Sequence, residues 1–167
     1  MIRSIAVIIA TGLLLALQGV LHKMPGLHVD VAALVIAYLV LERPVITGAA
    51  TALVVGYLQD LGSGGPTGLH AAASVMAFLV GRVAVAKVRA SGPVIQGVLG
   101  VLATWLTIGF ALAIDAFLGP GTSHVRAMMP ALPTIALTSI VLCYPVHRLL
   151  ARIDEKLGHG EEEFVLR

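Results

Sequence analysis

The chain has 167 residues, of which 58% are hydrophobic and only 12% are charged, and its formal net charge is +2. Because a soluble domain carries about 25% charged residues, this composition excludes a soluble globular protein, and the high hydrophobicity excludes a disordered one. The nearly balanced charge gives no indication of nucleic-acid binding, and the single cysteine, Cys143, excludes an intrachain disulfide. We therefore predict an all-α integral membrane protein.

Six apolar stretches lie between charged residues and proline or glycine breaks. A helix needs roughly 20 apolar residues to cross a bilayer, within a range of about 17–25. The predicted spans are residues 4–21, 27–41, 44–58, 68–86, 93–118 and 127–150. The second and third are short, at roughly 22 Å of helix each, so a re-entrant hairpin over both remains an alternative to two full spans. We expect a six-helix transmembrane domain over residues 1–151 and a charged, solvated cytoplasmic tail over residues 152–167.

The basic residues are distributed unevenly between the predicted loops. Lysine and arginine accumulate in the cytoplasmic loops of membrane proteins. With the N-terminus inside, only Lys23 and Arg126 lie on the outer side. The inner side then holds Arg3, Arg43, Arg82, Lys87, Arg89, Arg148, Arg152, Lys156 and Arg167. The asymmetry predicts that both termini are cytoplasmic, which requires an even number of spans.

This orientation gathers acids and histidines near the outer ends of the helices. They are Asp30, Asp60, Asp115, His22, His28, His70 and His124. A metal site or a proton relay is one interpretation, since ionisable residues near a span are functional candidates. We favour ordinary hydrated residues of the headgroup zone, because no span carries an acid at its middle and no metal-ligand spacing is present. The sequence also lacks the motifs of serine hydrolases, zinc proteases and P-loop enzymes, so we expect no enzyme, no metal and no cofactor.

The most informative tract runs from residue 56 to residue 70. It contains Gly56, Asp60, Gly64, Pro66 and Gly68. Glycine permits tight turns at positive φ, and proline prevents the preceding helix from continuing. Asp60 is placed to accept backbone N–H groups from the loop or from the start of the next helix. The tract therefore predicts a structured turn, with a partner or ligand site on that turn as the alternative.

Small residues recur at helical spacing on several predicted spans. Such faces let helices approach closely in lipid. One stripe is Gly48, Ala52 and Gly56, and a second is Ala73, Ala77 and Gly81. Both are expected to pack the third span against the fourth. Ala6 and Ala10 form a face on the first span that is a candidate for contact with another membrane protein, and Ala103, Thr107 and Ala111 lead to Asp115 on the fifth.

The length, the six spans and this tract resemble the MreD family of bacterial rod shape-determining proteins. That family carries a similar glycine–aspartate–glycine–proline–glycine turn after its third apolar segment. The layout resembles the family over nearly the whole chain, and the motif covers residues 56 to about 70. The resemblance implies a non-enzymatic scaffold in the inner membrane that serves cell shape and peptidoglycan synthesis within the elongation machinery.

The resemblance also implies partners. They are MreC and, less directly, the glycosyltransferase RodA with its partner transpeptidase and the cytoplasmic MreB filaments, all around a protein held in the lipid bilayer. The family is similar in fold to the substrate-binding subunits of energy-coupling-factor vitamin transporters. A vitamin-type transporter subunit is therefore the alternative function, and Ala6 and Ala10 have the spacing of the helix face that docks its transport partner.

Overall fold

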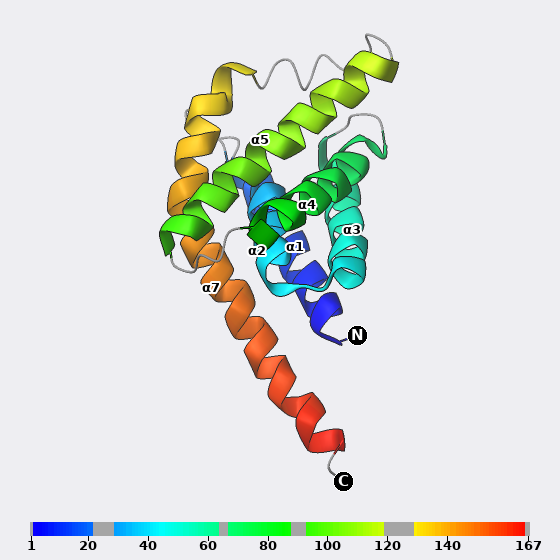
Figure 1. The fold of residues 1–167 in the computed structure, drawn as a ribbon, viewed down its shortest axis with the longest axis vertical. Coiled ribbons are helices and arrows are strands. Elements are labelled where there is room, and N and C mark those ends of the chain that lie inside the picture. The colour runs from blue at the N-terminus through cyan, green and yellow to red at the C-terminus, as the bar shows by residue number, and fades with distance from the viewer. Residues whose placement is uncertain (1, 22–28, 64–66, 88–92, 119–128, 166–167) are drawn as a thin grey trace.

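The computed structural model describes residues 2–21, 29–63, 67–87, 93–118 and 129–165. Within these ranges the chain forms six α-helices, one short 3-10 helix and no strand, as the composition predicted. The elements are α1 (Ile2–Leu21), α2 (Val31–Glu42), α3 (Val45–Ser63), α4 (Leu69–Lys87), α5 (Pro93–Leu118), η1 (Met129–Ala131) and α7 (Leu132–Val165). Figure 1 shows a bundle from which the C-terminal half of α7 protrudes, with the start of α1 and the end of α7 toward the same end.

Four of the described helices are long and apolar enough to cross a membrane. They are Val45–Ser63, Leu69–Ala86, Gln96–Ile114 and Leu132–Lys156, and between 28% and 39% of each is buried inside the bundle. Their outward faces carry large apolar side chains such as Trp105 and Leu137, which are 57% and 68% exposed. An apolar surface of this extent is stable in lipid rather than in water, so the protein is a membrane protein.

Helix α2 is the centre of the bundle. Residues 31–40 are all buried, and the helix contacts α1, α3, α4, α5 and α7. Because every side is covered, its apolar residues show no helical stripe. With 12 residues it is about 18 Å long at 1.5 Å per residue, against a hydrocarbon core of about 30 Å. It is shorter than the predicted span of residues 27–41, of which 27 and 28 lie outside the described residues.

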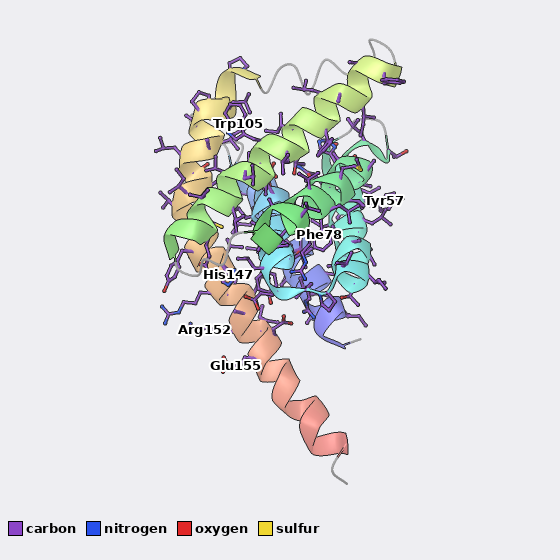
Figure 2. All side chains as sticks on the ribbon, viewed as in Figure 1. Tyr57, Phe78, Trp105, His147, Arg152 and Glu155 are labelled. Carbon is purple, nitrogen blue, oxygen red and sulfur yellow. The ribbon has the colours of Figure 1, made fainter. Side chains whose placement is uncertain are left out.

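The small-residue stripes of α3 and α4 pack these helices against each other and against α2. A Cβ atom added to Gly48 would lie 2.6 Å from Cε2 of Phe78, and one added to Gly81 would lie 2.9 Å from Cγ2 of Val40. Ala52, Ala73 and Ala77 are almost completely buried. Figure 2 shows Phe78 within the bundle. These stripes therefore serve internal packing, as the spacing predicted.

Two helices extend five or more residues beyond their predicted limits. Helix α3 continues to Ser63 rather than ending at residue 58, and α7 continues through residues 151 and 152 to Val165. The predicted boundary between bundle and tail thus lies inside one helix. In α7 the charged residues end the hydrophobic stretch but do not end the helix, since lysine, arginine and glutamate are good helix formers. The bounds of α5 agree with the prediction.

Candidate functional site

The carboxylate of Asp60 is buried at the junction of α3 and α4. Asp60 lies in the last turn of α3 and is only 2% exposed. Its Oδ2 accepts hydrogen bonds from the backbone N–H groups of Gly68 at 2.7 Å and Ala71 at 3.2 Å. Its Oδ1 accepts one from the N–H of His70 at 2.8 Å. The expected hydrogen bonds from Asp60 to the start of the next helix are therefore present.

This arrangement caps α4 with a side chain from another helix. The first N–H groups of a helix have no partner within it, and a residue just before the helix ordinarily supplies the acceptor. Here Gly68, which precedes α4, has no side chain, and its φ of +100° is a conformation that favours glycine. The carboxylate eight residues earlier takes the place of the cap. Its negative charge also complements the positive end of the α4 dipole.

Gly56 allows the two helices to come this close. A Cβ atom at position 56 would lie 2.6 Å from Cα of Ala71 and would also meet the carbonyl group of His70. Backbone atoms cannot rotate away as a side chain can, so the close approach requires glycine. Of the five predicted turn residues, the structure brings Gly56, Asp60 and Gly68 together, and Gly64 and Pro66 lie outside the described residues.

His70 adds a side-chain contact to the same carboxylate. Its Nδ1 lies 2.9 Å from Oδ1 of Asp60, and the two side chains are 13% and 0% exposed, respectively. The interpretation of Asp60 and His70 as ordinary hydrated residues is therefore wrong. The Asp60 carboxylate lies inside because the buried N–H groups at the start of α4 need an acceptor, and the His70 ring lies against that carboxylate.

Asp30 is likewise buried rather than hydrated. It is 8% exposed and caps α2, where its Oδ1 accepts from the N–H of Ala33 at 3.1 Å. Gln18 of α1 accepts from the N–H of Val31 at 3.0 Å through its Oε1. The side chain of Asp115 and the residues His22, His28 and His124 lie outside the described part of the chain.

A second polar cluster, which the sequence did not predict, lies at the other end of α2. Arg43, just after this helix, donates from Nη2 to Oδ1 of Asp154 at 2.5 Å, and the two side chains are 11% and 20% exposed. The hydroxyl of Tyr38 donates to Oδ2 of the same carboxylate. Arg82 donates from Nη1 to the carbonyl oxygen of Val40 at 2.9 Å. Asp154 thus belongs to the bundle, so the predicted solvated tail is wrong at this residue.

His147 extends this second cluster along α7. Its Nε2 lies 3.6 Å from Oε1 of Glu42, and its ring meets the Tyr38 ring edge-on, with centroids 5.2 Å apart. Figure 2 shows His147 on the side of α7 nearest the other helices. The two residues that bind Asp154, Tyr38 and Arg43, are 116 and 111 positions away from it in the chain. Only the seven-residue spacing of His147 and Asp154, two helical turns, hinted that they share a face.

The small face of α1 lies at the edge of the bundle. Ala6 and Ala10 are half-buried, and Ala10 packs against the core. Val7 and Thr11 beside them are fully buried. On α5, Ala103, Thr107 and Ala111 are buried as the stripe predicted. Contact of Ala6 and Ala10 with another protein stays a prediction.

The described residues offer little room for a ligand between α2, α4 and α5. The crevice there is lined by apolar residues, among them Ala37, Gly81 and Ala103, and has a volume of about 10 Å³. Small-molecule sites usually measure 300–1,000 Å³. Within the described part of the chain, no three His, Cys, Asp or Glu side chains gather to hold a metal ion. Comparison with protein-family models, curated proteins and solved structures found no match.

Proposed function

We propose that the protein is a non-enzymatic scaffold of the bacterial elongation machinery, held in the cytoplasmic membrane by six spans with both termini in the cytoplasm. The basic-residue asymmetry supports this orientation. So does the position of the start of α1 and the end of α7 toward one end of the bundle (Figure 1). Two shorter apolar stretches lie in α1, over Ile5–Val20, and in α2, over Val31–Glu42. We count these helices as the remaining two spans, with α2 enclosed by its neighbours rather than facing lipid.

The observation that carries the proposal is the Asp60 junction. A buried carboxylate that accepts three backbone N–H groups, together with Gly56 at a backbone contact, joins the end of α3 to the start of α4. Three residues of the tract that resembles the MreD family, Gly56, Asp60 and Gly68, therefore meet at this junction. The junction fixes α3 against α4, and a rigid bundle is what a scaffold presents to its partners.

The proposed partners follow from the resemblance. MreC is the direct one, and RodA, its transpeptidase and MreB are reached through the complex. We place the binding surfaces on the lipid-facing sides of the helices, where close van der Waals packing drives association. Ala6 and Ala10, half-buried on α1, mark one candidate surface.

Co-purification from native membranes followed by mass spectrometry tests the proposal. Cell-wall enzymes and MreC in the eluate support a scaffold. Recovery of a pair of ATPases with a small molecule would instead indicate the transporter subunit and refute the proposal.

A matched pair of variants locates the binding surface. Ala6→Leu with Ala10→Leu adds bulk to the predicted face and should reduce partner recovery. Ala16→Leu adds the same bulk to an exposed position of α1 and should not. The thermal midpoint of each purified variant is measured alongside, because Ala10 packs against the core. Unchanged recovery with the double variant would exclude α1 as the contact.

A further inference from the structure

The outward face of α7 changes from apolar to basic along its length. Leu137, Val141 and Tyr144 are 68%, 67% and 45% exposed. The same face then carries three exposed basic residues, Arg148, Arg152 and Lys156. Residues four apart lie above one another on a helix, so these three form a continuous row, which we call the basic stripe.

The opposite face of α7 fixes the direction of the basic stripe. Cys143, Leu150 and Asp154 face the bundle: the first two are buried, and Asp154 is held by Arg43 and Tyr38. Asp154 and Arg152 point to opposite sides, since successive residues are about 100° apart. Figure 2 shows Arg152 and Glu155 on the side of α7 away from the other helices.

The charge of the stripe is largely uncompensated. Within the described residues, no ion pair involves Arg148, Arg152 or Lys156. Asp154 is withdrawn into its contact with Arg43, so it does not neutralise the stripe. Glu155 is exposed beside Arg152, so the described side chains of this face, up to Lys156, carry three positive charges and one negative charge.

The sixth apolar stretch ends at residue 150, between Arg148 and Arg152, and we place the membrane interface there. Aromatic residues such as Tyr144 are enriched at that boundary, and Arg148 follows one turn later. A headgroup layer is about 5–7 Å thick on each side of the hydrocarbon core. Arg148 and Arg152 are about 6 Å apart along the helix, so both fit within one such layer. Lys156 lies about 6 Å further out, at its charged surface.

We infer that the basic stripe of α7 binds the phosphates of anionic phospholipid headgroups. Arginine binds phosphate through two parallel N–H groups, and lysine binds it as a point charge. The apolar residues of the same face hold the acyl chains beside the helix. This inference requires only that the protein is inserted in a membrane. It depends neither on the scaffold function nor on which end is cytoplasmic.

Native mass spectrometry of the full chain in detergent tests the inference. The protein is titrated with phosphatidylglycerol and with phosphatidylcholine of the same acyl chains. We expect wild type to prefer phosphatidylglycerol. Each basic residue near an anionic surface is worth about a fivefold preference, so Arg148→Gln, Arg152→Gln and Lys156→Gln together should lower it on the order of 100-fold.

A charge-retaining variant is the matched control. Arg148→Lys with Arg152→Lys alters the same positions, keeps three positive charges and should retain a preference for phosphatidylglycerol. Equal binding of both lipids to wild type, or an unchanged preference in the triple glutamine variant, would overturn the inference. A polyglutamate peptide serves as a second anionic ligand. If the triple glutamine variant loses binding of this peptide but keeps the preference for phosphatidylglycerol, the stripe binds an acidic protein and the inference is also overturned.

Discussion

Replacing Asp60 tests the junction of α3 and α4 most directly. Asp60→Asn keeps one acceptor oxygen and turns the other into an NH2 group, which then faces backbone N–H donors. Asp60→Leu removes both acceptors and leaves the N–H groups of Gly68, His70 and Ala71 without the bonds that the carboxylate supplies. The two variants therefore remove part of the cap and all of it.

The expected magnitudes follow from these hydrogen bonds. Loss of an N-terminal cap costs about 0.5–2 kcal/mol, and a buried donor left unpaired costs about 1–3 kcal/mol. Because Asp60 is 2% exposed, water cannot readily replace the carboxylate. We expect Asp60→Asn to lose roughly 1–2 kcal/mol and Asp60→Leu roughly 3–5 kcal/mol of the free energy of unfolding.

The measurement is denaturant unfolding of the purified protein in detergent. Tyr57→Phe is the control on the same helix, since Tyr57 is 49% exposed and Figure 2 shows it on the outside of α3. Its effect should stay within about 0.5 kcal/mol. If wild type and both Asp60 variants unfold with the same free energy, the carboxylate does not stabilise the junction, and its assignment as the cap of α4 is wrong.

Three further outcomes are expected. Gly56→Ala should destabilise the protein by about 1–3 kcal/mol through overpacking, whereas Gly62→Ala, whose new Cβ meets no atom within 4 Å, should be neutral or slightly stabilising in the same unfolding assay. Asp154→Ala removes the acceptor of two partly buried donors, Tyr38 and Arg43, and should lower the free energy of unfolding by about 1–3 kcal/mol. Arg152→Gln, at an exposed position of the same helix, should change it by less than about 0.5 kcal/mol. Similar losses from both variants would refute the assignment of Asp154 to the bundle. In a background lacking Cys143, a membrane-impermeant thiol reagent should label a cysteine at position 64 from outside the cell and leave one at position 89 protected, and the reverse pattern would invert the proposed orientation.

Helix bounds were predicted best where the ends of an apolar stretch coincide with the ends of the helix. The fifth apolar stretch starts at Pro93, favoured at a first helical position, and its predicted bounds match α5. The small-residue stripes of α3 and α4 and the cap from Asp60 also followed from spacing and side-chain chemistry. The cap joins residues 8 to 11 positions apart, and each stripe repeats every four residues along one helix, so a linear pattern can represent them.

Contacts between residues far apart in the chain could not be predicted, because the sequence carries no local pattern for them. The pairing of Asp154 with Arg43 depends on where α7 passes α2, which no local spacing encodes. A charged residue near the end of an apolar stretch also looks the same whether it faces solvent or the bundle. Asp154 and Arg152 are two residues apart and differ fully in this respect, because the helix turns through about 200° between them.

The enclosed position of α2 has a consequence for biosynthesis. A helix of about 18 Å is too short to span a hydrocarbon core of about 30 Å by itself, and its end groups would be unpaired in lipid. In the finished protein those groups are met by Gln18, Asp30 and Arg82. Gln18 and Asp30 are synthesised before α2 is complete, but Arg82 follows about 40 residues later. Helices α5 and α7, which also contact α2, are made later still. The central helix therefore reaches its final environment only after the last helix has been made, although it is the second to be synthesised.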